Sequence, residues 1–291
     1  MIVKGKRMKL LKDILKGVLI GISNIIPGVS GGTMAVSMGI YDTIISSITN
    51  LLKDFKKSIL TLLPYLVGML LGIGGLSFVI NYFFEDFPLQ TGLLFIGLIL
   101  GGLPSITKRL KGKGFSVINL ILFFIFFAAI IVLQLVSGER IAVLTTNFQF
   151  IQTLKLFLVG MVASATMVIP GVSGSLILML LGFYTPVVEE ISSFIKGLLA
   201  LDTSAILGGF VILIPFGIGV VVGMFAIAKL IEFLLKKFEA ATYSSILGLV
   251  IASPVVVLMT LEGVTFSVLP ILTGIITLAI GFFIAFKLGN E

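Results

Sequence analysis

The sequence predicts an all-α integral membrane protein made of two inverted-topology repeats, each with a motif-bearing re-entrant helical hairpin and three transmembrane helices. Three observations predict this fold. Of the 291 residues, 58% are hydrophobic and only 11% are charged, whereas soluble domains carry about 25% charged residues. A glycine-rich motif that begins at Pro27 recurs at Pro170. The basic residues gather in alternate loops, which indicates how the chain crosses the membrane.

The motif interrupts apolar sequence with a helix-breaking proline, glycines and hydroxyl side chains. Its two copies are Pro27, Gly28, Val29, Ser30, Gly31, Gly32 and Thr33, and Pro170, Gly171, Val172, Ser173, Gly174 and Ser175. Downstream, Gly39 and Tyr41 match Gly182 and Tyr184 at the same spacing. Since Ser175 replaces Gly32, we expect the two copies to differ in detail.

The first repeat, residues 1–140, is expected to begin with a basic amphipathic segment that leads into the apolar stretch 10–26 before the motif. A helix should follow the motif and end at a lysine cluster. Three spans come next, since about 20 apolar residues cross the hydrocarbon core. An acidic loop separates the first two spans and a basic loop separates the last two. The predicted elements after the motif are 33–52, 59–82, 91–107 and 115–136.

The second repeat, residues 141–291, is expected to follow the same order after a polar connector. Its predicted elements are 154–169, 176–200, 205–228, 242–261 and 266–286. The spacing between matching residues grows from 143 at the motif to 151 beyond it, as Gly68 and Gly219 show. The second repeat therefore carries eight extra residues between its motif helix and its next span.

The basic residues predict the orientation of the two repeats. If each motif segment returns to its starting side and three spans follow, each repeat crosses an odd number of times and the repeats are inverted. A cytoplasmic N-terminus then places all but three of the 20 Lys and Arg residues on the cytoplasmic side, as the positive-inside rule expects. The three outer cations are Arg140, Lys155 and Lys196. Both termini are predicted to be cytoplasmic.

The segment before the first motif raises two questions: whether it is a signal peptide, and whether it spans the membrane. We expect no signal peptide, because residues 23–33 lack a small-residue cleavage pattern and the stretch has a counterpart in mid-chain. The motif segments could be re-entrant hairpins or full spans, and hairpins are favoured because residues 10–26 are short and charged at their start.

Composition also narrows the chemistry. The chain has no Cys, which excludes disulfides and thiolate metal sites, and no His, the commonest general base and metal ligand. We therefore expect no metal, no cofactor and no catalytic residue. The net charge of +7 reflects topology rather than nucleic-acid binding.

A backbone break inside the hydrocarbon exposes N–H and C=O groups that only protein or a watery cavity can satisfy. The first N–H groups of a helix carry partial positive charge, and glycines let an anion approach the backbone closely. Hydroxyls of the motif can add donors or cap the helices. One copy alone would favour a packing kink, but two copies in inverted repeats favour an anion site.

The doubled motif, Pro-Gly-Val-Ser-Gly-Gly-Thr and Pro-Gly-Val-Ser-Gly, together with the chain length, resembles the DUF368 membrane proteins over essentially the whole chain. The resemblance implies a transporter that returns undecaprenyl phosphate, a polyprenyl lipid carrier, across the bacterial cytoplasmic membrane for recycling in cell-envelope synthesis. The implied mechanism is alternating access, with the phosphate head bound by both motif copies. Coupling to protons or another ion is left open, as are the direction of transport and the oligomeric state.

The motif also resembles the Pro-Gly-x-Ser-Arg-Ser motif of undecaprenyl-pyrophosphate phosphatase. Gly31 and Gly174 stand at the arginine position here, and the motif supplies no other cation for phosphoryl transfer. Glu189 and Glu190 are adjacent, so they project in different directions from a helix. A binding site without hydrolysis is therefore favoured over a phosphatase. A transporter of a small anion or an ion-coupled solute is the remaining alternative.

The candidate substrate-binding residues are Pro27, Gly28, Ser30, Gly31, Gly32, Thr33, Pro170, Gly171, Ser173, Gly174 and Ser175, with Arg140 as an outer guide for the phosphate or simply a solvated loop residue. Three carboxylates, Asp42, Glu189 and Glu190, are coupling candidates, because intramembrane carboxylates mark proton relays. Asp42 lies about 18 Å along the helix from Ser30. The alternative for Asp42 is an interfacial carboxylate near Lys53 or the N-terminal lysines. Asn24 and Thr166 are expected to bond carbonyls freed by the breaks.

Overall fold

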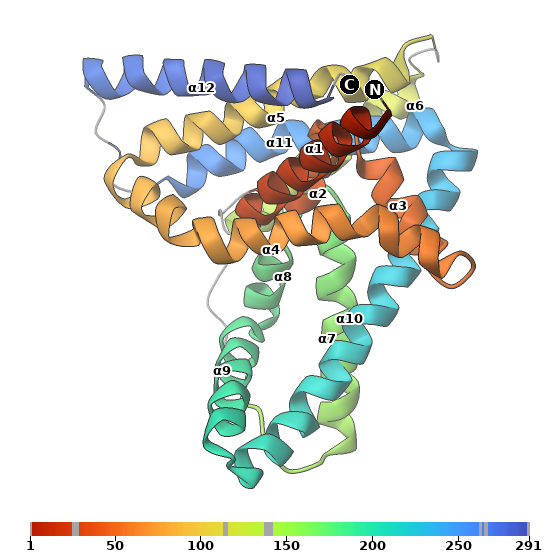
Figure 1. The fold of residues 1–291 in the computed structure, drawn as a ribbon, viewed down its shortest axis with the longest axis vertical. Helices are drawn as coiled ribbons and strands as arrows, with labels where there is room; N and C mark the ends of the chain where they lie inside the picture. Colours follow the sequence, from red (N-terminus) through yellow and green to blue (C-terminus); the bar gives the residue numbers. More distant parts are fainter. Residues whose placement is uncertain are drawn as a thin grey trace. The chain divides into compact units, whose positions relative to one another are not determined.

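The computed structural model describes residues 2–24, 29–112, 116–136, 142–261, 264 and 267–289 (Figure 1). These residues form twelve α-helices and no strand, which confirms the all-α prediction. Seven of the described helices are long and apolar enough to cross a membrane. The chain is therefore a multi-pass membrane protein.

The first six helices lie close to the predicted elements, except after the motif. Ser30 caps the helix Gly31–Ser37, which follows the first break. In the helix Pro88–Leu110, Pro88 occupies the first turn, and basic residues occupy the last turn, where they complement the helix dipole. The six helices are α1 (Ile2–Ser23), α2 (Gly31–Ser37), α3 (Tyr41–Thr49), α4 (Phe55–Asp86), α5 (Pro88–Leu110) and α6 (Val117–Val136).

The next six helices follow in the same order of long and short elements. Asp202 caps one of them, because its carboxylate accepts from the backbone N–H groups of Ser204 at 2.9 Å and Ala205 at 3.3 Å. The six helices are α7 (Phe150–Val168), α8 (Gly174–Leu181), α9 (Tyr184–Ala200), α10 (Thr203–Lys237), α11 (Glu239–Thr260) and α12 (Val268–Gly289).

The predicted single helix 33–52 is wrong, because the chain turns sharply between α2 and α3. Gly39 adopts a left-handed conformation with φ +67°. Its N–H donates to the Val36 carbonyl, and the Ile40 N–H donates to the Ala35 carbonyl, both at 3.0 Å. This pair of bonds is a Schellman motif, which closes the end of α2.

The predicted helix 176–200 is wrong for the same reason, since it is broken between α8 and α9. Gly182 has φ +80° and its N–H donates to the Met179 carbonyl at 2.9 Å, while Phe183 N–H donates to the Leu178 carbonyl at 2.8 Å. The axes of α8 and α9 differ by 105°. Both motif helices thus end at matching glycines, and both are followed by a second short helix.

The eight extra residues of the second half lie in α9. This helix has 17 residues, whereas α3 has nine. The flanking helices α2 and α8 differ by one residue, so the predicted insertion is located between the motif helix and the next span, as expected.

The described residues pack into two compact units. One comprises residues 1–134, 169–172 and 229–291, and the other comprises residues 135–168 and 173–228. In the first unit, α1 packs against α4, while α5 packs against α2, α11 and α12 (Figure 1). In the second unit, α7 packs against α8, and α8 contacts α9. These units are defined by packing. The boundary between the two sequence repeats, after residue 140, is a separate matter and remains a prediction.

Two close helix contacts at glycines are related by the same spacings, 143 and 151 residues, that relate the two sequence repeats. A Cβ at Gly68 would clash with the Ile14 carbonyl oxygen, and a Cβ at Gly219 would clash with the Phe157 carbonyl oxygen. Ile14 and Phe157 are 143 residues apart, and the two glycines are 151 apart. The contact of α1 with α4 therefore recurs as the contact of α7 with α10 within the other unit.

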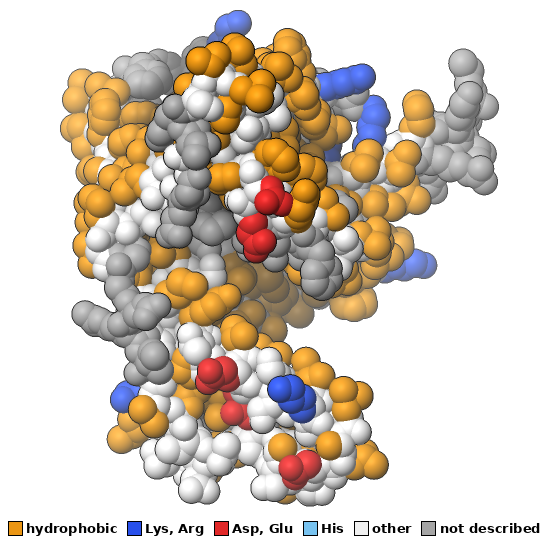
Figure 2. All heavy atoms as spheres, turned by 90° about the vertical axis from the view of Figure 1, so that its left-hand side faces the viewer, with side chains coloured by type: hydrophobic (Ala, Val, Ile, Leu, Met, Phe, Trp, Pro, Cys, Tyr) orange, Lys and Arg blue, Asp and Glu red, His pale blue; other side chains and the backbone are white. Residues whose placement is uncertain are grey.

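The surface is rich in exposed apolar side chains, as membrane-facing helices require. On the face in Figure 2, hydrophobic side chains spread over wide areas and charged side chains appear in a few separate groups. Examples from the apolar helices are Val117, Leu269 and Phe283, each more than half exposed.

Candidate functional site

The first motif copy is built around two buried hydroxyls at the start of α2. Ser30 has an extended backbone, and its Oγ accepts from the Thr33 backbone N–H at 3.1 Å. The Ser30 and Thr33 hydroxyls lie 2.9 Å apart. Ser30 is 3% exposed and Thr33 is fully buried. The predicted capping role of Ser30 is therefore present in the structure.

Asn24 joins the two sides of the first break. Its Nδ2 donates to the Ile20 carbonyl at 3.0 Å, and its Oδ1 accepts from the Gly31 backbone N–H at 3.1 Å. Thr166 similarly donates to the Ala163 carbonyl at 2.7 Å. Both residues thus bond carbonyls one turn back in their own segment, although the Ile20 carbonyl also accepts the Asn24 backbone N–H at 3.3 Å and is not one that the break leaves free. Pro27 and Gly28 lie outside the described residues.

The second motif copy meets the described residues of the first through the backbone N–H of Gly171. The Gly171 N–H donates to Ser30 Oγ at 3.0 Å and to Thr33 Oγ1 at 2.7 Å. Gly171 has φ +81°, and a Cβ there would lie 2.7 Å from the Leu249 carbonyl oxygen. Only glycine fits this position without strain. The preceding Pro170 is buried.

The remaining residues of the second copy begin α8. The Ser173 and Ser175 hydroxyls lie 2.7 Å apart and are part-buried. Unlike Ser30, Ser173 makes no side-chain capping bond to its helix. A Cβ at Gly174 would crowd the Met167 side chain and the Ala163 carbonyl. The two copies therefore place their hydroxyls differently, as the change from Gly32 to Ser175 suggests.

In chemical terms, the motif offers backbone N–H groups and hydroxyls without any cationic side chain. The described residues contain no group of three His, Cys, Asp or Glu side chains that could hold a metal ion. In this structure the Ser30 and Thr33 hydroxyls are bonded to each other and to Gly171. These two hydroxyls are thus closed against ligands in the described arrangement.

Asp42 lies in a polar network that the sequence did not predict. Its Oδ1 and Oδ2 accept from the Tyr243 hydroxyl at 2.8 and 2.7 Å, and its Oδ2 lies 2.9 Å from Arg109 Nη2. These residues belong to α3, α11 and α5, in the first unit. Arg109 is therefore an ion-pair partner of Asp42, whereas the interfacial alternative named Lys53 and the N-terminal lysines.

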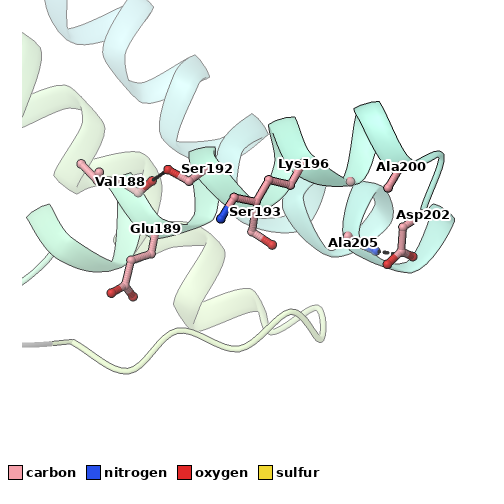
Figure 3. Close-up of a pocket in the computed structure, with 9 residues that line it drawn as sticks. Val188, Glu189, Ser192, Ser193, Lys196, Ala200, Asp202 and Ala205 are labelled. Carbon is pink, nitrogen blue, oxygen red and sulfur yellow. Dashed lines mark hydrogen bonds between the residues drawn. The ribbon is translucent and has the colours of Figure 1, made fainter.

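Glu189 and Glu190 have no comparable network. Glu189 is exposed, and it lines an open groove of about 520 Å³ in the second unit. Figure 3 shows that the residues of this groove, Ser192, Ser193 and Lys196 among them, come from α9 and the start of α10. No hydrogen bond or ion pair holds either glutamate among the described residues. Arg140 lies outside the described part of the chain.

Three functional candidates escaped the sequence analysis. In the sequence, Arg109 and Lys16 stand out only as basic residues of cytoplasmic segments, and no pattern distinguishes Tyr243. Lys16 is 8% exposed and donates from Nζ to the Met38 carbonyl at 3.2 Å, at the end of α2. A lysine near the apolar stretch could have signalled burial, but Tyr243 carries no comparable signal in the sequence.

The chain is similar to known proteins over most of its length. The family model described as undecaprenyl phosphate translocase-like matches residues 20–270. A protein of Staphylococcus aureus named polyprenyl-phosphate transporter is 33% identical over 281 residues, which cover 96% of this chain and 95% of that protein. A Vibrio cholerae protein of the same name is 30% identical over 264 residues, 86% of this chain and 78% of that protein. No solved structure matches. With a family model that spans most of its length and a motif that occurs twice, the chain belongs to the undecaprenyl phosphate translocase-like family, the DUF368 membrane proteins.

Proposed function

We propose that this protein transports a polyprenyl phosphate, most simply undecaprenyl phosphate, between the two leaflets of the bacterial cytoplasmic membrane. The observation that carries the proposal is the contact of Gly171 with the Ser30 and Thr33 hydroxyls, because it brings backbone and hydroxyl donors of both motif copies together. The names of the two relatives and the family support the substrate class. These names also favour transport over hydrolysis.

The chemistry of the motif suits a carrier that must release its cargo. A phosphate monoester accepts hydrogen bonds strongly, and backbone N–H groups at a helix start favour anions. A site without a lysine or arginine binds such a head group more weakly than a phosphatase site does. Transfer of a phosphoryl group also requires cations that the motif lacks. Binding followed by release is therefore the role that these donors serve.

Alternating access explains why the motif is closed in this structure. For a phosphate to reach Ser30 and Thr33, the Gly171 N–H must leave their hydroxyl oxygens. The repeated glycine contacts of α1 with α4 and of α7 with α10 fit two repeats that rearrange in turn. We further propose that both termini are cytoplasmic, since that orientation accounts for the distribution of Lys and Arg.

Reconstituted protein tests this function directly. Proteoliposomes that carry undecaprenyl phosphate on one leaflet should exchange it to the other faster than protein-free liposomes. Ser173→Ala should slow exchange by roughly tenfold, the loss expected for one hydrogen bond to a charged group. Because Ser173 does not cap α8 and loses only a part-buried bond to Ser175, this variant should lose less thermal stability than Ser30→Ala, which removes the cap of α2 and should lose both stability and exchange.

Ser192→Ala is the matched control, since the Ser192 hydroxyl donates only within α9, to the Val188 carbonyl at 3.0 Å. It should exchange the lipid at the wild-type rate. Absence of exchange by the wild-type protein would overturn the proposal. Release of inorganic phosphate from undecaprenyl pyrophosphate would instead support the phosphatase alternative, and exchange of short-chain phosphates alone would support a small-anion transporter.

A further inference from the structure

The network at Asp42 joins three helices of the first unit at one point. Asp42 stands in the first turn of α3, Arg109 in the last turn of α5 and Tyr243 in the second turn of α11. Both oxygens of the carboxylate are used, by one hydroxyl and one guanidinium. Hydrogen bonds to a charged group are stronger than those between neutral groups. The carboxylate therefore fixes α3 to α5 and α11.

This network lies at one end of α2, and the closed motif lies at the other. α2 has seven residues, so its ends are about 10 Å apart. Ser30 and Thr33 hold Gly171 at its N-terminal end. At its C-terminal end, the Lys16 amino group holds the Met38 carbonyl, and the turn at Gly39 leads directly to Asp42. A short helix moves as one body, so a shift at either end is passed to the other.

Water can reach the network although it cannot reach the Ser30 and Thr33 hydroxyls. The side chains of Asp42 and Arg109 are 38% and 53% exposed, whereas Ser30 and Thr33 are buried. A cavity of about 30 Å³ lies beside Asp42 and is lined also by Val36, Ser105 and Tyr243. That volume is large enough for one water molecule. Breaking the ion pair therefore leaves both charges with access to solvent, so the network is able to open.

We propose that Asp42, Arg109 and Tyr243 form a latch that holds α2 in the closed position, and that this latch must open before a phosphate head can reach the motif hydroxyls. The proposal rests on the transport function proposed above, for which Asp42 is then a positioning residue that acts through α2. The second half places Thr185 at the position of Asp42, so it offers no carboxylate there. The latch thus belongs to one face of the transporter.

The absence of cysteine from the chain allows a test that needs no substrate. Val36 is 4% exposed and lies on α2 beside the cavity, so Val36→Cys reports whether α2 is closed. In membranes, a water-soluble maleimide should alkylate this cysteine slowly. Adding Asp42→Asn should speed alkylation by roughly tenfold, the effect expected when a charged hydrogen bond is lost. Arg109→Gln removes the other member of the ion pair and should speed alkylation by the same factor. Arg109→Lys keeps the charge and should speed it less.

Lys236→Gln is the control in the same Val36→Cys background, because it removes a separate ion pair, that of Lys236 with Glu232 at 2.6 Å, from its exposed side and leaves Glu232 in place beside Thr49 at the end of α3. It should leave the alkylation rate unchanged. Each variant must elute from size exclusion as the wild type does, so that faster alkylation is not read from misfolded protein. Equal alkylation of the Asp42→Asn, Arg109→Gln and control proteins would overturn the latch.

Lipid exchange by the same variants separates the latch from the transport function. In proteoliposomes with undecaprenyl phosphate, the latch variants should change the exchange rate, whereas Lys236→Gln should not. Faster alkylation with a wild-type exchange rate would overturn the positioning role of Asp42. If wild-type protein exchanges no lipid but the latch variants alkylate faster, the proposed function fails while the closed-state latch stands.

Discussion

Gly171 is the residue on which the closed motif depends most directly. Its N–H is shared between the Ser30 and Thr33 oxygens, and both its φ of +81° and the nearby Leu249 carbonyl exclude a side chain. The role of a motif glycine here is therefore conformational as well as steric. A backbone donor at this point links residues that are 138 and 141 positions apart in the sequence.

Gly171→Ala is expected to destabilise the protein. A left-handed conformation costs a non-glycine residue about 1–2 kcal/mol, and the contact with the Leu249 carbonyl adds to that cost. Thermal unfolding in detergent should show a lower midpoint than that of the wild type. Gly217→Ala is the control, because a Cβ at Gly217 in α10 meets nothing within 4 Å, and alanine favours a helix. Equal midpoints for the two variants would contradict the assigned role of Gly171.

The sequence predicted the residues of the motif better than the residues around it. Ser30, Asn24 and Thr166 could be assigned capping or carbonyl-bonding roles because the groups they bond lie within seven residues in the chain. The partner of Asp42 could not be assigned in the same way. Tyr243 is 201 positions away, and no local pattern indicates which distant side chain a carboxylate will meet.

At the scale of the helices, the sequence predicted the order and approximate bounds of the spans, since the bilayer thickness sets their length and composition. It did not predict that each motif helix would stop after seven or eight residues. Gly39 and Gly182 are matching positions, but apolar residues at helical spacing continue beyond each of them, as Ile44 and Ile48 do, and they conceal the turn. A glycine followed two residues later by tyrosine was the available signal.

The contact of α1 with α4 offers a prediction at this scale. Gly68→Val should prevent close packing, because a Cβ at Gly68 would overlap the Ile14 carbonyl oxygen and the backbone cannot yield as a side chain can. We expect a lower yield of monodisperse protein by size exclusion. Gly75→Val is matched to it, since Gly75 lies in the same helix and a Cβ there meets nothing within 4 Å. A normal profile for Gly68→Val would show that α1 and α4 do not need this contact.

For the molecule as a whole, composition was sufficient to predict a membrane protein. A surface with so few charged residues is suited to lipid rather than to water. The spacings of 143 and 151 predicted a repeat, and the glycine contacts follow both spacings. A repeat in packing does not by itself set the direction in which each copy crosses the membrane. Inversion of the two repeats remains a prediction from charge, and it has a direct consequence for matching positions.

If the repeats are inverted, matching residues lie on opposite sides of the membrane. Lys53 and Lys196 are 143 residues apart, so Lys53→Cys should be protected from a membrane-impermeant maleimide added to intact cells, whereas Lys196→Cys should react. Lys111→Cys in the loop after α5 should likewise be protected, and Val264→Cys in the loop after α11 should react. Permeabilised cells provide the control, because all four cysteines should then react. Labelling of both members of a pair from the same side would show that the repeats are parallel. A single site between parallel repeats could not open to each face of the membrane in the way that alternating access requires.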